Sequence, residues 1–151
     1  MALELKGERE LPAPREALWA LLNDPAVLQK TLPGCNSVEA IGPDRYRMGL
    51  KLQVANVSGE YAGEVEIRDK QAPARYVLAV AGEGSIGFMR GSASFDLEEA
   101  GAAATRLRYA GTAEVGGVVA GVGQRVLAGV ARFLVERFFK NLEKHIAGPG
   151  S

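Results

Sequence analysis

The chain has few of the residues that build metal centres or disulfide frameworks. Among its 151 residues are a single cysteine, Cys35, and a single histidine, His145. One cysteine excludes an internal disulfide and any multi-cysteine metal site, and one histidine leaves no cluster of metal ligands. We therefore expect no metal ion, and a reducing compartment suits the chain.

An excess of charge of either sign is also lacking. The 18 basic and 18 acidic residues cancel, and the basic ones are spread along the chain instead of forming one run. Nucleic-acid binding needs a concentrated positive field. Nucleic acid is therefore not an expected partner.

Long apolar runs are missing as well. The most apolar stretch, residues 115–122, is far shorter than the roughly 20 residues that a membrane-spanning helix needs. Residues 1–6 carry charges where a signal peptide needs its apolar segment. We expect a cytoplasmic protein, for which peripheral contact with the inner face of the cytoplasmic membrane stays open.

What the chain does contain is mostly strand pattern. Residues 3–11 alternate as a first strand, and Pro14, Pro25 and Pro33 then delimit two short helices. Alternating strands joined by short turns follow, and such strands pair antiparallel. A long helix is expected from about Val119 to Ile146, with this apolar stripe: Val122, Val126, Val130, Phe133, Leu134, Phe138 and Leu142.

This order predicts an α+β fold in which a curved antiparallel sheet grips the long C-terminal helix, with two short helices after the first strand. One domain should span residues 1–147. Residues 148–151 form a short tail that is either native or a remnant of cloning.

The sheet face expected to point inward carries very small side chains: Gly59, Gly63, Gly82, Gly84, Gly91, Ala93, Gly111 and Ala113. Glycine weakens a strand, so its repeated use favours strong curvature or a ligand close to the backbone. We therefore predict an apolar cavity between sheet and helix. The alternative is that the glycines only relieve bending and that helix side chains fill the space.

The predicted lining of this cavity combines apolar walls with a few hydroxyls: Leu50, Tyr61, Gly63, Val65, Leu78, Val80, Phe95, Tyr109, Gly111, Val122, Val126, Val130 and Phe133. The glycine-rich segment before the long helix is either a gate or a plain connector. Its candidate gate residues are Gly116, Gly117 and Gly121.

No catalytic set emerges from the sequence. Cys35 has no neighbouring base, and His145 is expected to be a solvated residue near a helix end. Glu60, Glu64 and Glu66 share a strand face predicted to be wet, where pairing with basic residues of neighbouring strands explains them. We predict no catalytic residues and no covalent cofactor.

Short motifs are spread from about Leu3 to Leu142: Gly59-Glu60-Tyr61-Ala62-Gly63, Gly87-Phe88-Met89-Arg90-Gly91, Thr105-Arg106-Leu107-Arg108-Tyr109, Val115-Gly116-Gly117 and Gly123-Gln124-Arg125. In combination they resemble CoxG, the family of carbon monoxide dehydrogenase G subunits within the START-like (SRPBCC) superfamily. The stretch 118–122 departs from the family pattern, because relatives are usually more polar there. By this resemblance the fold is of the helix-grip type.

The resemblance also implies a function. It suggests a non-enzymatic binding or carrier protein for a quinone (menaquinone or ubiquinone) or another lipid-like ligand, accessory to a molybdenum hydroxylase of the carbon monoxide dehydrogenase type. The role would be electron delivery to the quinone pool, membrane recruitment or maturation. Two alternatives stay open: a cyclase- or hydrolase-like enzyme on the same fold, and a ligand-free protein interaction module with a filled core.

Overall fold

The computed structural model describes residues 1–54 and 57–147. Its elements are β1 (Ala2–Leu11), α1 (Arg15–Leu22), α2 (Pro25–Thr31), β2 (Cys35–Gly42), β3 (Arg45–Leu52), β4 (Gly59–Gln71), β5 (Arg75–Gly84), β6 (Gly87–Glu99), β7 (Thr105–Gly116), the 3₁₀ helix η2 (Val118–Val122) and α3 (Gln124–Ala147). The expected tail, 148–151, lies outside the described residues.

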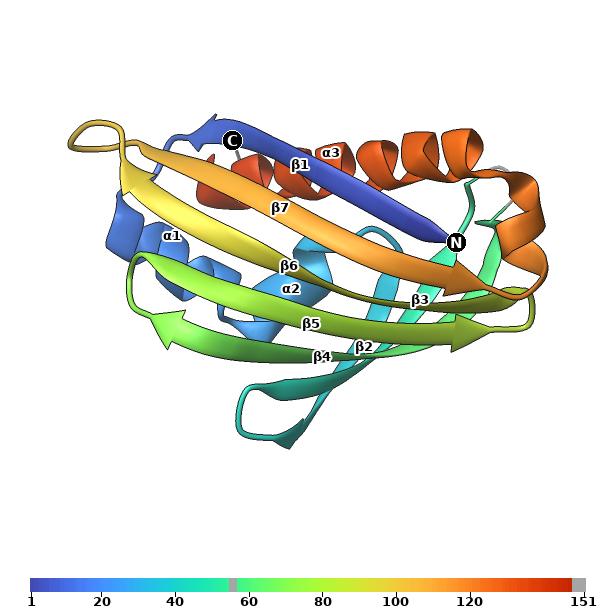
Figure 1. Cartoon of the computed structure of the whole chain (residues 1–151). Helices are drawn as coiled ribbons and strands as arrows, with labels where there is room; N and C mark the ends of the chain where they lie inside the picture. The colour runs from blue at the N-terminus through green and yellow to red at the C-terminus, as the bar shows by residue number, and fades with distance from the viewer. Residues whose placement is uncertain (55–56, 148–151) are drawn as a thin grey trace.

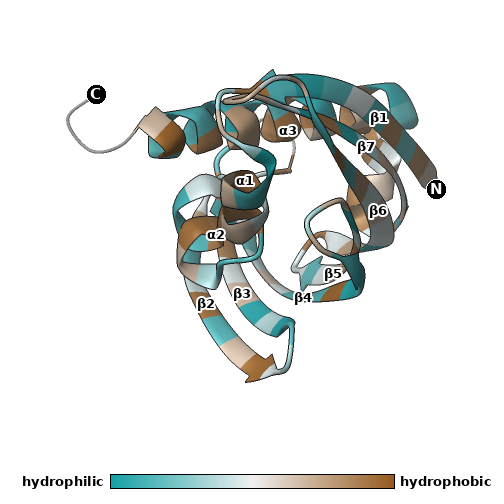
Figure 2. Ribbon diagram, turned by 90° about the vertical axis from the view of Figure 1, so that its left-hand side faces the viewer, coloured by the Kyte–Doolittle hydropathy of each residue, from teal (hydrophilic) through white to brown (hydrophobic). Residues whose placement is uncertain are grey.

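The strands form one antiparallel sheet in the order β1-β7-β6-β5-β4-β3-β2. Viewed along the strands, the sheet curls through a wide arc, and α3 and the α1–α2 pair lie on its open side (Figure 2). The backbone of α3 comes close to β1, α2 and η2, and α2 comes close to β2. The helices therefore bridge the two edges of the sheet, as Figure 1 also shows, and the predicted α+β helix-grip fold is confirmed.

Prolines and a polar cap delimit the two short helices, as the sequence predicts. Pro14 precedes α1, and the Asp24 carboxylate accepts a hydrogen bond of 2.9 Å from the amide of Ala26 where α2 begins. After α2 the chain turns at Gly34, which has a φ of 74°. A Cβ there would lie 2.3 Å from the main-chain oxygen of Lys51, so only glycine allows this entry into β2.

The long C-terminal helix is shorter than its sequence pattern suggests. Residues 118–122 form the separate helix η2, and α3 begins only at Gln124. The two glycines that flank η2 have left-handed backbones, with a φ of 88° at Gly117 and 104° at Gly123. Because helical geometry cannot pass through such residues, the expected single helix is divided.

The convex face of the sheet is solvated and carries ion pairs. Arg45 lies 3.9 Å from Glu64 and 3.5 Å from Glu66, and Arg47 lies 3.6 Å from Glu64. All of these residues come from the neighbouring strands β3 and β4. The predicted cross-strand pairing of charges is confirmed for these residues.

Among residues 1–54 and 57–147, the buried apolar side chains form two clusters at opposite ends of the sheet. The first cluster lies beneath α1, α2 and the C-terminal half of α3, and includes Leu11, Leu18, Leu28, Leu107, Phe139 and Leu142. The second cluster lies beneath η2 and consists of Val57, Val115, Val119 and Leu127. Strand β7 connects the two, since it contains both Leu107 and Val115. The part of the concave face between the two clusters is the candidate ligand site.

Candidate functional site

Small residues face one another across neighbouring strands on the concave face. The register pairs Gly111 with Ala93, Ala113 with Gly91 and Gly82 with Gly63. Directly opposed residues of an antiparallel pair project from the same face. The prediction that these small residues share a face is confirmed, and they form a band that crosses β7, β6, β5 and β4.

The glycines in this band do different things. A Cβ on Gly91 would lie 2.3 Å from the main-chain oxygen of Thr112, so Gly91 is required by the close approach of bent strands. A Cβ on Gly84 would lie 2.8 Å from the ring of Tyr61, so Gly84 makes room for that ring. A Cβ on Gly82 would meet, within 4 Å, the main-chain oxygen of Ala62 at 3.7 Å, an ordinary van der Waals contact. Gly82 therefore has room for a side chain.

Apolar side chains between the two clusters are only half-buried, although they belong to the concave face. Val80 lies in the middle of β5, opposite Val65 of β4 and Gly91 of β6, yet it is half-buried. Among the described residues, Val80 and Leu50 are not part of the packing around either cluster, and Tyr61 reaches the second cluster only through the main-chain oxygen of Val57. Valine on a central strand is fully buried where a close-packed core covers it. These side chains therefore stay partly uncovered on the concave face, in the part of the sheet that we call the concave middle.

The predicted lining residues fall into three groups around the concave middle. Val65, Leu78, Phe95 and Tyr109 are half-buried and border the first cluster. Val122 and Val130 border the second cluster, and Leu50, Tyr61 and Val80 lie between the two. Phe95 and Tyr109 are also part of a continuous row of aromatic rings that runs from Trp19 through Tyr76 to Phe139.

The structure corrects the placement of Val126 and Phe133. Their exposed fractions are 43% and 50%, so neither lines the interior. Phe133 is nine residues from the buried Leu142, which at about 100° per residue places the two on opposite sides of α3. The inward face of α3 instead carries Leu127, Phe139 and Leu142. The adjacent rings of Phe138 and Phe139 were one sequence signal for this buried side of the helix.

An arginine that the sequence analysis missed joins β1 to α3. Arg9 lies on the concave side of β1, and its guanidinium hydrogen-bonds the carboxylates of Glu136 and Glu143, the latter at 2.9 Å. It also lies 5.5 Å from the centre of the Phe139 ring. The hydrogen bond from Arg9 lowers the pKa of Glu136. A charged residue at an inward position of an otherwise apolar strand was the available signal.

The polar groups of the concave middle are few and already engaged. The Tyr61 hydroxyl donates a hydrogen bond of 2.6 Å to the main-chain oxygen of Val57, and burial raises its pKa. The Cys35 thiol, in the same cross-strand row as Leu50 and Tyr61, donates to the main-chain oxygen of Ser37 at 3.5 Å. Burial raises the pKa of this thiol, which reduces its nucleophilic thiolate form.

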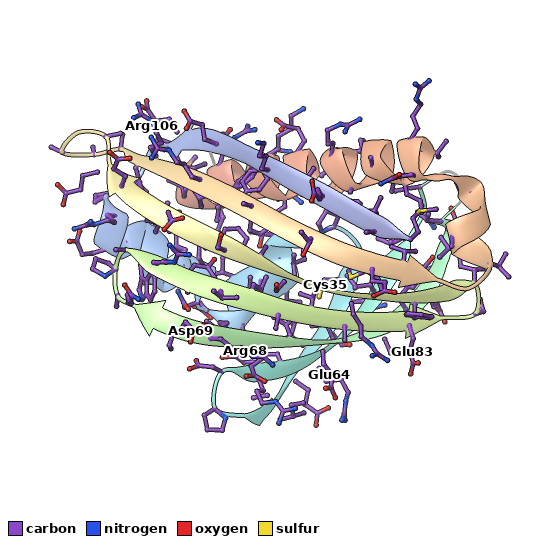
Figure 3. All side chains as sticks on the ribbon, viewed as in Figure 1. Cys35, Glu64, Arg68, Asp69, Glu83 and Arg106 are labelled. Atoms are coloured by element: carbon purple, nitrogen blue, oxygen red, sulfur yellow. The ribbon has the colours of Figure 1, made fainter. Side chains whose placement is uncertain are left out.

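Other charged side chains point elsewhere. Glu64, Arg68 and Glu83 project from the convex side, away from α3 (Figure 3). Within residues 1–54 and 57–147, no three histidine, cysteine, aspartate or glutamate side chains gather in a way that could hold a metal ion. The same residues contain no helix with the length and apolar character needed to cross a bilayer.

Two open hollows lie on the outside of the molecule. One is at the β4–β5 turn, beside Asp69, Lys70 and Arg75. The other follows β1, β7, β6 and β5, and most of its lining residues, such as Ser92 and Thr112, belong to the convex face. Neither hollow is the predicted apolar cavity, since both open on the solvated side of the sheet.

The candidate gate residues differ in their surroundings. Gly116 is in β7, where a Cβ would lie 2.4 Å from the Phe88 ring. The absence of a side chain at Gly116 therefore leaves room for that ring. Gly117 has a left-handed backbone and lies against Gly87, whereas a Cβ on Gly121 would meet nothing within 4 Å. Gly123, which the sequence analysis did not select, is the second left-handed glycine that flanks η2.

Solved structures resemble this chain along nearly its whole length. A conserved protein from Geobacillus kaustophilus is 42% identical, with a TM-score of 0.94 and coverage of 96% of this chain and 95% of that chain. A START superfamily protein from Mycobacterium smegmatis is 14% identical, with a TM-score of 0.79 and coverage of 95% and 97%. A protein from Thermus thermophilus is 20% identical, with a TM-score of 0.69 and coverage of 98% and 99%.

The last two structures share the fold alone, which is therefore START-like. No curated protein matches the chain. The family model for CoxG, the G subunit of carbon monoxide dehydrogenase, matches residues 7–147, and the chain belongs to this family.

Proposed function

We propose that the protein is a non-enzymatic carrier that holds one apolar, lipid-like molecule against the concave middle of its sheet. The observation that supports this most is the half-buried state of Leu50, Tyr61 and Val80 between two separate apolar clusters. Apolar walls that protein atoms leave uncovered gain free energy when an apolar guest covers them, at roughly 25 cal/mol per Å².

The guest we propose is a quinone, menaquinone or ubiquinone, and the carrier would serve a molybdenum hydroxylase of the carbon monoxide dehydrogenase type. The family's name supports the second part, because it describes a component of that enzyme. The residues present match the isoprenoid tail of a quinone better than its head, since the Tyr61 hydroxyl already donates to Val57. A bound quinone would carry two electrons between the enzyme and the membrane pool.

The titratable side chains of the concave middle favour ligand binding and transport over catalysis. Its titratable side chains include Tyr61 and Cys35, and burial raises the pKa of both. Both therefore stay protonated at neutral pH, whereas general acid–base catalysis works best with a group whose pKa lies near the working pH.

We also propose that η2 is the entrance for the guest. Val119 of η2 is buried in the second cluster, and its amide donates to the main-chain oxygen of Ile86 at 2.7 Å. The segment is flanked by the left-handed glycines Gly117 and Gly123, which can absorb a change in backbone angles. Opening of η2 would expose the second cluster and, behind it, the concave middle.

The carrier proposal is tested by filling the concave middle. Gly82→Leu adds a side chain where a Cβ has a single neighbour at 3.7 Å, so the fold should persist while the space is lost. We expect menaquinone binding, measured by titration with fluorescence quenching, to weaken at least tenfold, about 1.4 kcal/mol. Ala81→Leu is the matched control, because Ala81 is the exposed neighbour on the convex face.

Protein purified from its natural host should in addition contain a stoichiometric apolar molecule by native mass spectrometry and organic extraction, and should co-purify with the hydroxylase. The carrier proposal is contradicted by a ligand-free protein that also refuses quinones. Equal binding by Gly82→Leu and the unaltered protein would show that a guest, if bound, lies elsewhere.

A further inference from the structure

The charged side chains on the convex face of the sheet follow an ordered layout. Four strands lie side by side there, in the order β1-β7-β6-β5 (Figure 1). Because opposed residues of antiparallel neighbours project from the same face, the register arranges their convex side chains in rows that cross the strands. Neighbouring rows are about 7 Å apart along a strand. Four consecutive rows carry the inference below.

The two outer rows are charged, and the two inner rows are charged only on β1. From β1 to β5, the first row is Ala2, Glu114, Arg90 and Ala81; the second is Glu4, Thr112, Ser92 and Ala79; the third is Lys6, Ala110, Ser94 and Val77; and the fourth is Glu8, Arg108, Asp96 and Arg75. The shallow hollow that follows these strands lies over the inner rows. The middle of this face is therefore low and uncharged.

Several charges of these rows are not compensated within the chain. Glu4, Lys6, Arg90 and Glu114 are exposed and take part in none of the ion pairs among the described residues. The fourth row differs, because its charges pair with one another, for example Arg108 with Glu8 at 3.1 Å. The free charges are thus available to a partner.

A two-fold axis across the strands, midway between the second and third rows, would make the charges of two copies complementary. Rotation about it lays the second row of one copy over the third row of the other, and the first row over the fourth. Glu4 then faces Lys6 of the second copy. Glu114 then faces Arg108, and Arg90 faces Asp96. Within these four rows, no two charges of the same sign face each other.

We propose that this part of the convex face binds a second copy of the chain, with the two sheets stacked face to face about that axis. Stacked sheets keep their strands within about 30° of each other and lie about 10 Å apart. The small side chains of the inner rows allow this approach, and the long side chains around them meet across the interface. A second copy is favoured over an unrelated protein because a single symmetry operation matches all of these charges.

The size of the surface predicts a weak dimer. Four rows on four strands cover roughly 500 Å² of each copy, or roughly 1,000 Å² in total, which is the lower limit for a specific interface. Helix α3 and η2 lie on the other side of the sheet, so both concave middles stay accessible in the dimer (Figure 2). The inference therefore does not depend on the proposed function.

The test is sedimentation equilibrium of charge-reversal variants, at protein concentrations between about 5 and 200 µM. E4K gives each copy two lysines at the matched positions, and K6E gives each copy two glutamates. Each variant alone should have a dissociation constant at least tenfold higher than the unaltered protein, because like charges face each other. An equimolar mixture should recover dimerisation to within about threefold, since every such contact between unlike copies is attractive.

Matched controls place the same changes outside the four rows. Glu60 and Lys51 are exposed on the convex side of β4 and β3, and have no ion pair in the described structure. E60K and K51E should not weaken the dimer, and mixing them should not strengthen it. In the middle of the surface, Ala110→Arg should abolish dimerisation, whereas Ala62→Arg on β4 should not, although both alanines are exposed.

Three results would overturn the inference. The first is an unaltered protein that stays monomeric over the whole concentration range. The second is a dimer that E4K, K6E and Ala110→Arg leave intact, which would place the contact on another surface. The third is a loss in E4K and K6E that mixing does not restore, which contradicts the two-fold arrangement. Menaquinone titration of Ala110→Arg keeps this inference apart from the carrier proposal, because a convex substitution should leave guest binding unchanged.

Discussion

At the scale of single residues, the concave face shows what a sequence pattern can and cannot predict. Strict alternation placed the glycines of β4 to β7 on one face, because strand geometry has a period of two residues. The alternation pattern could not predict why each position needs glycine. Whether a missing side chain reflects a bent neighbour, a ring or open space depends on strands that are distant in sequence, such as β7 beside Gly91.

Two of these glycines should respond differently to the same substitution. Gly91→Ala forces a Cβ to within 2.3 Å of the Thr112 main-chain oxygen, and should lower the free energy of unfolding by about 2 kcal/mol. Gly82→Ala meets only an atom at 3.7 Å and should change it by less than about 0.5 kcal/mol or stabilise the strand. Urea denaturation measures both, and similar losses would contradict the assigned roles.

At the scale of elements, α3 shows why a helix can be predicted while its buried side is not. Val126, Val130 and Phe133 form one apolar stripe, and Leu127, Leu134 and Phe138 form another. The stripe that includes Val122 predicts the wrong buried side, because Gly123 interrupts the helix and the side chains of η2 do not continue in helical register into α3. Packing against β1 and α2 selects the stripe, and no local pattern contains that contact.

The contact of Arg9 with α3 predicts a dependence of stability on pH. The folded pKa of Glu136 lies below its ordinary value of 4.5, so the pair stabilises the fold above that value and loses its effect as pH falls through the folded pKa. Glu136→Gln should therefore have a lower urea midpoint than the unaltered protein at neutral pH, and the gap should close as the pH falls below 4.5 and through the folded pKa of Glu136.

Glu83→Gln is the control for this pH series. Glu83 is exposed on the convex face, and no ion pair among the described residues includes it. Its substitution should leave the urea midpoint nearly unchanged at every pH. A gap between Glu136→Gln and the unaltered protein that does not shrink as the solution is acidified would mean that the carboxylate charge is not the cause.

At the scale of the whole molecule, the order of elements determined the fold. A strand, two short helices, a meander and a final helix allow few arrangements, and the START-like fold and CoxG membership agree with the expectation. The division of the core could not be predicted in this way. It depends on the distance between α3 and the middle of the sheet, which arises from curvature accumulated over seven strands.

The proposed entrance makes a prediction at this scale. Val119→Ala removes packing from a small cluster, and should weaken the closure of η2 by about 2 kcal/mol, or roughly 30-fold in the opening equilibrium. Hydrogen exchange of the Val119 amide, which is bonded to Ile86, should accelerate accordingly. The Leu97 amide, bonded to Ala74 beside the first cluster, should not change. Equal acceleration of both would indicate global unfolding.

A core in two pieces has a consequence for how the molecule melts. The clusters beneath η2 and beneath α1 are connected chiefly through the backbones of the strands. Without a ligand, the protein should therefore unfold in more than one step as it is heated. A ligand bound between the two clusters would contact both of them, so that they would unfold together as one cooperative unit. Its arrival would sharpen the melting transition, and in a cell it would protect the laden form from proteolysis more than the vacant one.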